Sequence, residues 1–372
     1  MSILRIGISG AGLISQVEHI PNLLHLPNLF EVVAVADPSA RARAFVAERW
    51  GLATHESLDG LLGERLDALL VASPDFAHRD TVLRGLAAGL HVLCEKPLCY
   101  DVADVDRLIA ARDAAGHVLQ VGYMKRFDPS VEAALAALPA SGDGLRYIAV
   151  EVNEAETAVH MSHHPYGPGG DLPHDLIAAG RAEQRRQINA AIGRPLDGPL
   201  YAGFATAYCA SMVHDVNLVH LVLDRLGVPD GQVVGADLFC GGEGVLGAVR
   251  LLDGRAAWQM MHLMVPKVAD YRERVAFYFD DRIIELIFPS PYLNHQQTEL
   301  VIQRSAGHRF ERTLVRSSYD ESYVRELVGF WSSVAGGAPV RNTAGEARRD
   351  LWLLADLARY AAGHRLAPPA AP

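Results

Sequence analysis

One short segment constrains the fold of this 372-residue chain more than any other, the run Gly10-Ala11-Gly12-Leu13-Ile14-Ser15. It follows an apolar run typical of a buried strand, residues 4–9, and opens a predicted helix, residues 13–26, which Pro21 is expected to kink. Glycines here permit a tight turn and let the backbone approach a pyrophosphate, while the small Ser15 still allows close packing. The next predicted strand ends in Asp37, about 20 residues beyond the turn, where a carboxylate accepts hydrogen bonds from a ribose diol. This order predicts a dinucleotide-binding Rossmann fold.

The same residues indicate which dinucleotide is bound. Asp37 would repel a 2′-phosphate, which favours NAD over NADP. Arg41 and Arg43 follow closely and weaken that preference, so NADP remains possible. The predicted cofactor contacts at this end of the domain are Gly10, Gly12, Leu13, Ile14 and Asp37.

Residues 1–123 alternate short apolar runs with amphipathic stretches, which predicts a doubly wound parallel sheet covered by helices. Beyond residue 124 the runs become longer and β-rich, and their turns carry Gly or Asp. We therefore expect an α/β protein with a second, α+β domain over residues 124–372 that contains a large, mainly antiparallel open sheet. Helices are predicted over residues 208–226, 319–336 and 343–364, and the Ala/Pro-rich tail 366–372 is expected to be loose.

Two strand ends carry the candidate reactive groups. Ser73-Pro74 and His78 follow the third major strand, and Glu95-Lys96-Pro97 follows the fourth. Ligands of open α/β sheets bind beyond the carboxyl ends of the strands, so Lys96 would point toward the nicotinamide. An ammonium there can hydrogen-bond a substrate hydroxyl and stabilise the charge that develops as hydride leaves.

Composition excludes several classes of protein. The formal net charge of −10 argues against nucleic acid and anionic membranes as partners. No apolar run approaches the ~18 residues of a membrane helix. The four cysteines lack CxxC spacing, so neither a zinc knuckle nor a disulfide framework is indicated. We expect a soluble, cytoplasmic protein.

Taken together, the motifs resemble those of the Gfo/Idh/MocA oxidoreductases, the family of glucose–fructose oxidoreductase and inositol dehydrogenase. The resemblance extends over nearly the whole chain. Its elements are Gly10-Ala11-Gly12, Ala34-Val35-Ala36-Asp37, Ala72-Ser73-Pro74 with His78, Glu95-Lys96-Pro97, and Val121-Gly122-Tyr123 running into Arg126-Phe127-Asp128-Pro129. It implies a Rossmann domain, a C-terminal domain whose open sheet joins subunits into a homodimer or homotetramer, and a catalytic Lys96. It also implies that Ser73, Pro74, His78 and Glu95 lie at the cofactor, and that Tyr123 and Arg126 lie at the substrate.

The family places a second catalytic group on the first helix of the C-terminal domain, commonly as Asp-x-x-x-His. Here His214 matches the proton-transferring histidine, whereas Ala210 stands where the carboxylate is expected and Asn217 where a later Asp often falls. Histidine titrates near neutrality, which suits proton transfer. The resemblance thus implies catalytic roles for His214 and Tyr123 and a substrate contact for Asn217, and Asp215 could orient the imidazole.

Residues 154–207 form a segment longer than this family usually needs. It contains several histidines that, with Asp171, could ligate zinc, namely His160, His163, His164 and His174. Pro and Gly residues break any fixed spacing between them, so no metal is predicted. We expect instead a lid that folds over the substrate cleft or over that of a neighbouring subunit, with His160 and His163 hydrogen-bonding substrate hydroxyls.

The leading hypothesis is an NAD(P)-dependent oxidoreductase that exchanges hydride with a CH–OH group of a polyol, sugar, cyclitol or sugar derivative, with Lys96 and His214 assisting proton transfer. One alternative is an enzyme that keeps NAD tightly bound and uses transient oxidation for an elimination. Another is a non-catalytic dinucleotide-binding sensor, which Ala210 makes conceivable.

Overall fold

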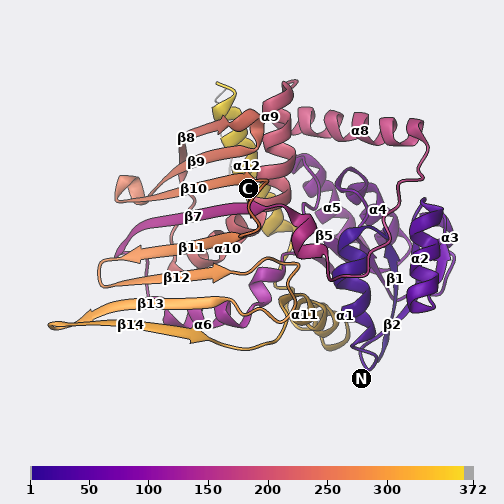
Figure 1. Cartoon of the computed structure of the whole chain (residues 1–372), viewed down its shortest axis with the longest axis horizontal. Coiled ribbons are helices and arrows are strands. Elements are labelled where there is room, and N and C mark those ends of the chain that lie inside the picture. Colours follow the sequence, from indigo (N-terminus) through magenta and orange to yellow (C-terminus); the bar gives the residue numbers. More distant parts are fainter. Residues whose placement is uncertain (1, 364–372) are drawn as a thin grey trace. The chain divides into compact units, whose positions relative to one another are not determined.

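The computed structural model describes residues 2–363, and the chain forms two compact units, each discontinuous in the sequence (Figure 1). Residues 2–127, 162–187 and 322–349 form the first unit, and residues 128–161, 188–321 and 350–363 form the second. The sequence places the boundary after residue 123, close to the first crossing at 127, but it does not foresee the two later stretches that return to the first unit. The tail 366–372 lies outside the described residues.

The first unit is built on a six-stranded, fully parallel sheet with the order β3-β2-β1-β4-β5-β6. This confirms the doubly wound sheet predicted from the sequence. Its strands are β1 (Leu4–Ser9), β2 (Phe30–Ala36), β3 (Ala53–His55), β4 (Ala68–Val71), β5 (His91–Glu95) and β6 (Leu119–Gly122). Its connecting helices are η1 (Ser15–His19), α1 (Ile20–Leu24), α2 (Ala40–Trp50), α3 (Leu58–Leu62), α4 (Asp75–Ala87) and α5 (Val102–Ala115), and η2 (Met124–Phe127) follows β6.

Local sequence explains where the helices begin and end. The Ser39 hydroxyl accepts a hydrogen bond from the Ala42 amide at the start of α2, and Gly51 ends that helix with φ +67°. The first helix differs from the prediction, because its opening turn, η1, is π-helical. Pro21 in α1 has no amide hydrogen to donate to the preceding turn, which accounts for an irregularity at this place.

A helix from the far end of the chain completes the core of the first unit. In α11 (Ser322–Gly336), Leu327 and Phe330 are fully buried in one apolar cluster with Ile8 of β1 and Leu23 of α1. The sheet buries both faces, so it needs this cover as well as its own crossover helices.

The second unit contains an eight-stranded sheet with the order β14-β13-β12-β11-β7-β10-β9-β8. All neighbours are antiparallel except β7 and β10, which confirms the predicted mainly antiparallel sheet. Its strands are β7 (Leu145–Ala155), β8 (Gln232–Phe239), β9 (Gly244–Leu251), β10 (Ala256–Val265), β11 (Arg272–Phe279), β12 (Arg282–Phe288), β13 (Glu299–Ala306) and β14 (Arg309–Arg316).

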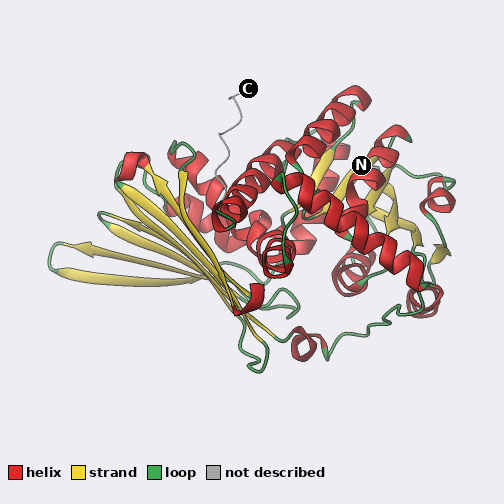
Figure 2. Ribbon diagram, turned by 90° about the horizontal axis from the view of Figure 1, so that it is seen from above, coloured by secondary structure: helices red, strands yellow, loops and turns green. Residues whose placement is uncertain are grey.

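Helices cover one face of this second sheet (Figure 2). Along β7, Ile148, Val150 and Val152 are buried, while Tyr147 and Glu151 alternate with them and remain accessible. The helices around this sheet are α6 (Pro129–Ala137), α7 (Thr157–Met161), α9 (Gly198–Ala202), η3 (Gly203–Met212), α10 (Val213–Leu226) and α12 (Ala344–Ala361), while α8 (His174–Ile192) runs through residues of both units. The helix predicted over residues 208–226 thus begins inside the π-helical η3 and continues as α10.

Candidate functional site

The glycine turn after β1 has the geometry that a phosphate-binding turn requires. Gly10 has φ +106°, and a Cβ there would overlap the carbonyl group of Ala72 and lie 2.6 Å from the Ser73 nitrogen. A Cβ on Gly12, by contrast, would meet no atom within 4 Å. Ser15 is fully buried and donates from its hydroxyl to the Gly10 carbonyl at 2.6 Å. Gly10 therefore shapes the turn, and Gly12 leaves open space in front of it.

Asp37 lies directly beyond β2 and is tied to this turn. Its Oδ2 accepts from the Ala11 amide at 2.8 Å, and its Oδ1 accepts from the Ser39 amide at 2.8 Å. Each carboxylate oxygen has a second lone pair, and the residue is half-buried, so the carboxylate can also accept from a diol. The open space at Gly12 and the fixed carboxylate together fit the pyrophosphate and ribose of a dinucleotide.

His78 braces the loops that follow β4 and β5. It is buried, with Nδ1 2.8 Å from the Pro97 carbonyl and Nε2 2.7 Å from the Ser73 carbonyl. The structure thus brings Ser73 and His78 together with the Lys96–Pro97 segment, where the peptide bond is cis. The imidazole itself holds this edge of the sheet together through two backbone carbonyls.

A buried group of acids lies beside Lys96. Oε1 of Glu95 is 2.7 Å from Nε2 of His19, and Oε2 of Glu95 accepts from the Lys96 amide at 3.1 Å. Burial acts to raise the pKa of Glu95, but the His19 hydrogen bond and the nearby positive charges outweigh it and lower that pKa. Glu326 of α11 is fully buried, and burial together with the Glu95 charge raises its pKa well above the usual value. Glu95 is accordingly held as a carboxylate and Glu326 as an acid.

Tyr123 and Arg126 are both buried within the first unit. The Tyr123 carbonyl accepts from the Asn342 amide group at 2.9 Å. The Arg126 guanidinium donates to the Arg341 carbonyl at 3.0 Å and forms an ion pair with Glu346. These contacts tie the Arg126 guanidinium to other residues of the first unit. We therefore do not propose that Arg126 binds substrate.

His214 and Asp215 lie in the second unit, where they are adjacent on α10 and both buried. Burial, followed by the charges of Asp215 and Glu154, raises the pKa of Tyr271 well above its usual value. Oε2 of Glu154, at the end of β7, is within hydrogen-bonding distance of Nε2 of His262 on β10, at 2.8 Å. Asp215 thus lies in a polar region of the second unit with Tyr271 and the Glu154–His262 pair, of which Asp215 and His262 are buried.

Apart from Asp215, the residues of this polar region are not singled out by the sequence. Tyr271 and Glu154 stand at strand ends without a motif, and only the pairing of β7 with β10 and β11 places them together. The Tyr271 hydroxyl donates to Glu273 at 2.8 Å, which fixes the ring. In the sequence, these two residues are marked only by the alternation of polar with apolar residues near strand ends.

Two side chains predicted to contact substrate form hydrogen bonds with other residues of the protein. His160 is buried, with Nδ1 2.9 Å from the Ser290 hydroxyl and Nε2 2.7 Å from the Ala269 carbonyl. The amide nitrogen of Asn217, which is 1% exposed, donates to buried Asp350 at 2.7 Å. Both side chains therefore connect parts of the second unit, and we do not propose either as a substrate contact.

The middle of the predicted lid packs on the first unit. Residues 162–187 belong to the first unit, where the Gln187 side chain donates to the Phe76 carbonyl at 2.8 Å and Gly180 packs against the Phe76 ring. His163 is exposed, and its ring centroid lies 4.0 Å from that of His164. The middle of the insertion thus packs on the dinucleotide-binding unit, because its small residues admit close contact there.

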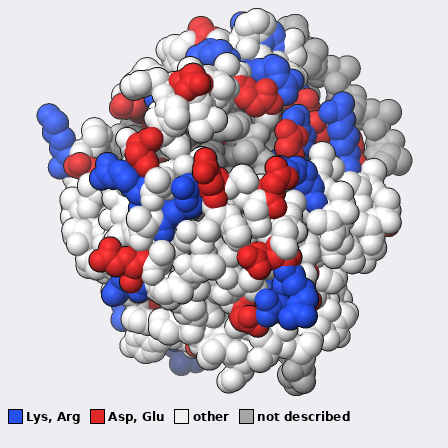
Figure 3. Space-filling model, turned by 90° about the vertical axis from the view of Figure 1, so that its right-hand side faces the viewer, with Lys and Arg blue, Asp and Glu red and all other residues white. Residues whose placement is uncertain are grey.

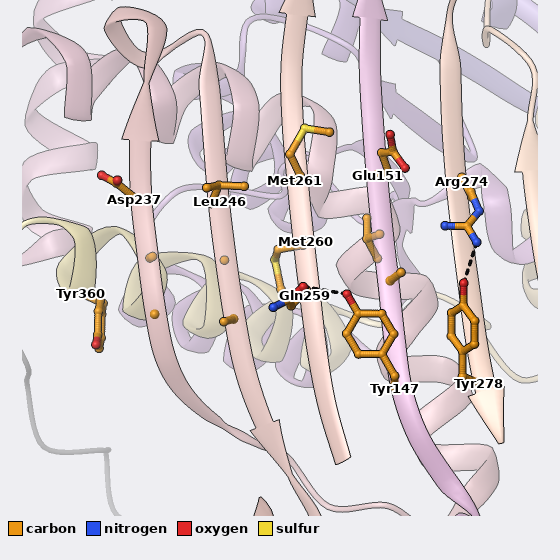
Figure 4. Close-up of a pocket in the computed structure, with 16 residues that line it drawn as sticks. Tyr147, Glu151, Asp237, Leu246, Gln259, Met260, Met261, Arg274, Tyr278 and Tyr360 are labelled. Carbon is orange, nitrogen blue, oxygen red and sulfur yellow. Dashed lines mark hydrogen bonds between the residues drawn. The ribbon is translucent and has the colours of Figure 1, made fainter. Parts of the chain in front are cut away.

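A shallow pocket of about 670 Å³ lies on the sheet face of the second unit (Figure 4). The Tyr147 hydroxyl donates to Gln259 at 2.7 Å, and Arg274 donates to the Tyr278 hydroxyl at 2.8 Å. Leu246 is 44% exposed beside them. None of the predicted site residues lines this pocket, so it is separate from the predicted chemistry.

The structure also bears on metal binding, membrane insertion and surface charge. Among residues 2–363, no group of three or more His, Cys, Asp or Glu side chains is arranged to hold a metal ion. Within that same range, no helix is long and apolar enough to cross a membrane. On the face drawn in Figure 3, Lys and Arg are interspersed with Asp and Glu.

Comparison with known proteins gives one match to a family model. Residues 4–123 match an oxidoreductase family with an NAD-binding Rossmann fold. The chain is 33% identical to inositol 2-dehydrogenase 3 of Saccharopolyspora erythraea over 174 residues, which is 46% of this chain and 51% of that protein. It is 37% identical to inositol 2-dehydrogenase of Arthrobacter sp. (strain FB24) over 177 residues, 47% of this chain and 50% of that protein. These alignments span about half the length of the relatives.

Solved structures share the fold over nearly the whole chain. A UDP-N-acetylglucosamine 3-dehydrogenase from Acidithiobacillus ferrooxidans superposes with a TM-score of 0.68 at 20% identity, covering 95% of this chain and 96% of that one. A 3-ketoreductase from Actinomadura kijaniata, solved with NADP and TDP-benzene, gives a TM-score of 0.69 at 19% identity with the same coverage. At these identities the likeness establishes the fold alone.

Proposed function

Because residues 4–123 belong to the Gfo/Idh/MocA family of oxidoreductases, we propose that the chain is an NAD-dependent oxidoreductase acting on a CH–OH group of a polyol, cyclitol or sugar derivative. The family membership confirms the resemblance found in the sequence, and the chain carries an NAD-binding Rossmann domain. The observation that carries the proposal furthest is the glycine turn, in which open space at Gly12 adjoins the fixed carboxylate of Asp37.

The proposed chemistry divides between two kinds of group. NAD held at the glycine turn and Asp37 would supply the hydride acceptor, and a side chain of the protein must take the proton from the substrate hydroxyl. We assign that proton to His214, because histidine is the side chain best suited to proton transfer near neutrality, and Asp215 is beside it in the chain. Lys96 would donate to the reacting oxygen and stabilise its negative charge, and Tyr123 is a further candidate donor.

The relatives bear on the substrate. Those named inositol 2-dehydrogenase support a cyclitol, and the UDP-N-acetylglucosamine 3-dehydrogenase that shares the fold is compatible with a sugar derivative. We propose cyclitols first, because the inositol dehydrogenases also resemble the chain in sequence. Arg126, His160 and Asn217 are left out of the proposed substrate contacts, because their polar atoms already bind within the protein.

We also propose that the chain forms homo-oligomers through the face of the second sheet drawn in Figure 4. That face combines accessible apolar side chains such as Leu246 and Met261 with small residues such as Ala149. Such a surface suits burial against a second copy. The four cysteines are free thiols, which supports a reducing, cytoplasmic location.

The test is a survey of purified protein with NAD or NADP and a panel of cyclitols and sugars, followed by absorbance of the reduced nicotinamide. With an active substrate, Lys96→Met should lower turnover by ~10²–10³, because a donor to the developing charge is lost. Lys267→Met is the matched control, since Lys267 is exposed and lies in the second unit. Turnover by Lys96→Met close to that of Lys267→Met would remove Lys96 from the mechanism.

A further inference from the structure

The insertion supplies a loop, residues 165–173, that lies against the dinucleotide-binding end of the first unit; we call it the strap. Two ties fasten it, one at the glycine turn and one at the start of α2. These are the places that, under the function proposed above, hold the pyrophosphate and the adenosine ribose. The inference below rests on that function.

The first tie is Gln16, a buried residue of η1. Its amide nitrogen donates to the Gly167 carbonyl at 3.0 Å, and its amide oxygen accepts from the Gly167 nitrogen at 2.9 Å. The same nitrogen donates to the Ala11 carbonyl at 2.7 Å, inside the glycine turn. One buried side chain thus connects the strap to the turn.

The second tie is Asp171, whose carboxylate is seated on the N-terminus of α2. Its Oδ1 accepts from the Ser39 hydroxyl, and its Oδ2 accepts from the Arg41 amide at 3.0 Å. The Ser39 hydrogen bond and the backbone amides lower the pKa of Asp171, so the group is anionic. A helix N-terminus favours negative charge, and here the chain provides that charge itself.

Close packing holds the strap in place between the ties. A Cβ on Gly167 would overlap the Phe45 ring and lie 2.6 Å from the Phe45 Cβ. A Cβ on Gly169 would lie 3.0 Å from the Ser39 hydroxyl. Burial, followed by the negative charge of Asp37, raises the pKa of the Tyr166 phenol.

These contacts bear on the choice between NAD and NADP. NADP differs by a 2′-phosphate on the adenosine ribose, which in this fold needs donors just beyond the second strand. Here Ser39 and the Arg41 amide already bind Asp171. The Arg43 guanidinium is directed to the carbonyls of Asp37 and Pro38, at 2.6 and 3.0 Å. We propose that Asp171 occupies the anion position a 2′-phosphate would need, and that it determines specificity for NAD together with Asp37.

The test measures binding, so it does not require a known substrate. Calorimetric titrations at low ionic strength give dissociation constants for NAD and NADP with the wild-type chain, Asp171→Asn and Asp175→Asn. Asp175 is the matched control, an exposed acid of α8 in the same unit. Wild type should prefer NAD, and Asp171→Asn should reduce the NADP-to-NAD ratio of dissociation constants by about tenfold, since it removes a like charge and keeps an acceptor for Ser39. Asp175→Asn should leave the ratio unchanged.

The outcomes separate the two proposals. A wild-type chain that binds neither nucleotide overturns the proposed function and this inference with it. A chain that binds NAD, but whose ratio is the same in Asp171→Asn and Asp175→Asn, overturns the inference alone. A wild-type preference for NADP also refutes the role of Asp171. Melting temperatures of the variants show that each is folded.

Discussion

The two glycines of the turn should respond to alanine in opposite ways. At Gly10, alanine must adopt φ +106° and place its Cβ against the Ala72 carbonyl. Backbone strain of this kind costs about 1–3 kcal/mol, and overpacking adds about 1–3 kcal/mol. We therefore expect Gly10→Ala to lower the free energy of unfolding by about 2–6 kcal/mol. Gly12 lacks a positive φ, and its added Cβ would meet no protein atom within 4 Å. Gly12→Ala should thus change stability by less than about 1 kcal/mol.

Binding of NAD, by contrast, should be sensitive to alanine at Gly12. The Cβ of Gly12→Ala would occupy the space in front of the turn, so NAD affinity should fall by at least about tenfold while the fold remains intact. Urea denaturation followed by tryptophan fluorescence measures the first effect, and calorimetric titration with NAD measures the second. If Gly12→Ala destabilised the protein as much as Gly10→Ala, or bound NAD as wild type does, the assignment of the two glycines would be refuted.

Three further perturbations test the contacts described above. Gly167→Ala should overlap Phe45, loosen the strap and speed NAD dissociation in stopped-flow displacement; an unchanged rate would show that the strap does not retain the nucleotide. The raised pKa of Glu326 means that its contribution to stability is present below pH 4.5 and is lost as the pH rises through the folded value. Glu326→Gln should therefore stabilise the protein increasingly above pH 4.5 in urea titrations, and a pH-independent effect would contradict this. Asp350→Ala removes a buried acceptor of His220, at 2.6 Å, and should cost about 2–4 kcal/mol of unfolding free energy; a cost below about 1 kcal/mol would contradict that role.

The sequence predicted the parts of the fold that depend on local patterns. The apolar run over residues 4–9 located β1, and the strands predicted to end at Asp37 and before Ser73 are β2 and β4. It did not predict the return of α11 to the first unit, because Leu327 and Phe330 look like any amphipathic helix until the sheet they cover is known. The short elements β3 and α3 were missed, because three to five residues carry too little periodicity.

The same difference between local patterns and distant contacts applies to the candidate site. Gly10, Gly12 and Asp37 form a local motif, and the structure ties Asp37 to the glycine turn through the Ala11 amide, while their contacts with a dinucleotide stay a prediction. The lid hypothesis and the family resemblance predict substrate contacts for His160 and Asn217, but no local pattern shows that partners of their side chains lie 130 and 133 residues away. Asp171 was considered only as a zinc ligand for the same reason, since its partner Ser39 is 132 residues distant.

Isotope transfer tests the proposed reaction most directly. Purified protein would be incubated with NAD and carbon-deuterated cyclitols and sugars, and the nicotinamide product would be examined by mass spectrometry. Direct hydride transfer from a CH–OH carbon predicts reduced NAD that carries one deuterium from the substrate, formed by Lys267→Met but strongly diminished in Lys96→Met. Reduced NAD without deuterium, or no reduced NAD with any substrate of the panel while NAD is bound, would contradict the proposed oxidoreductase.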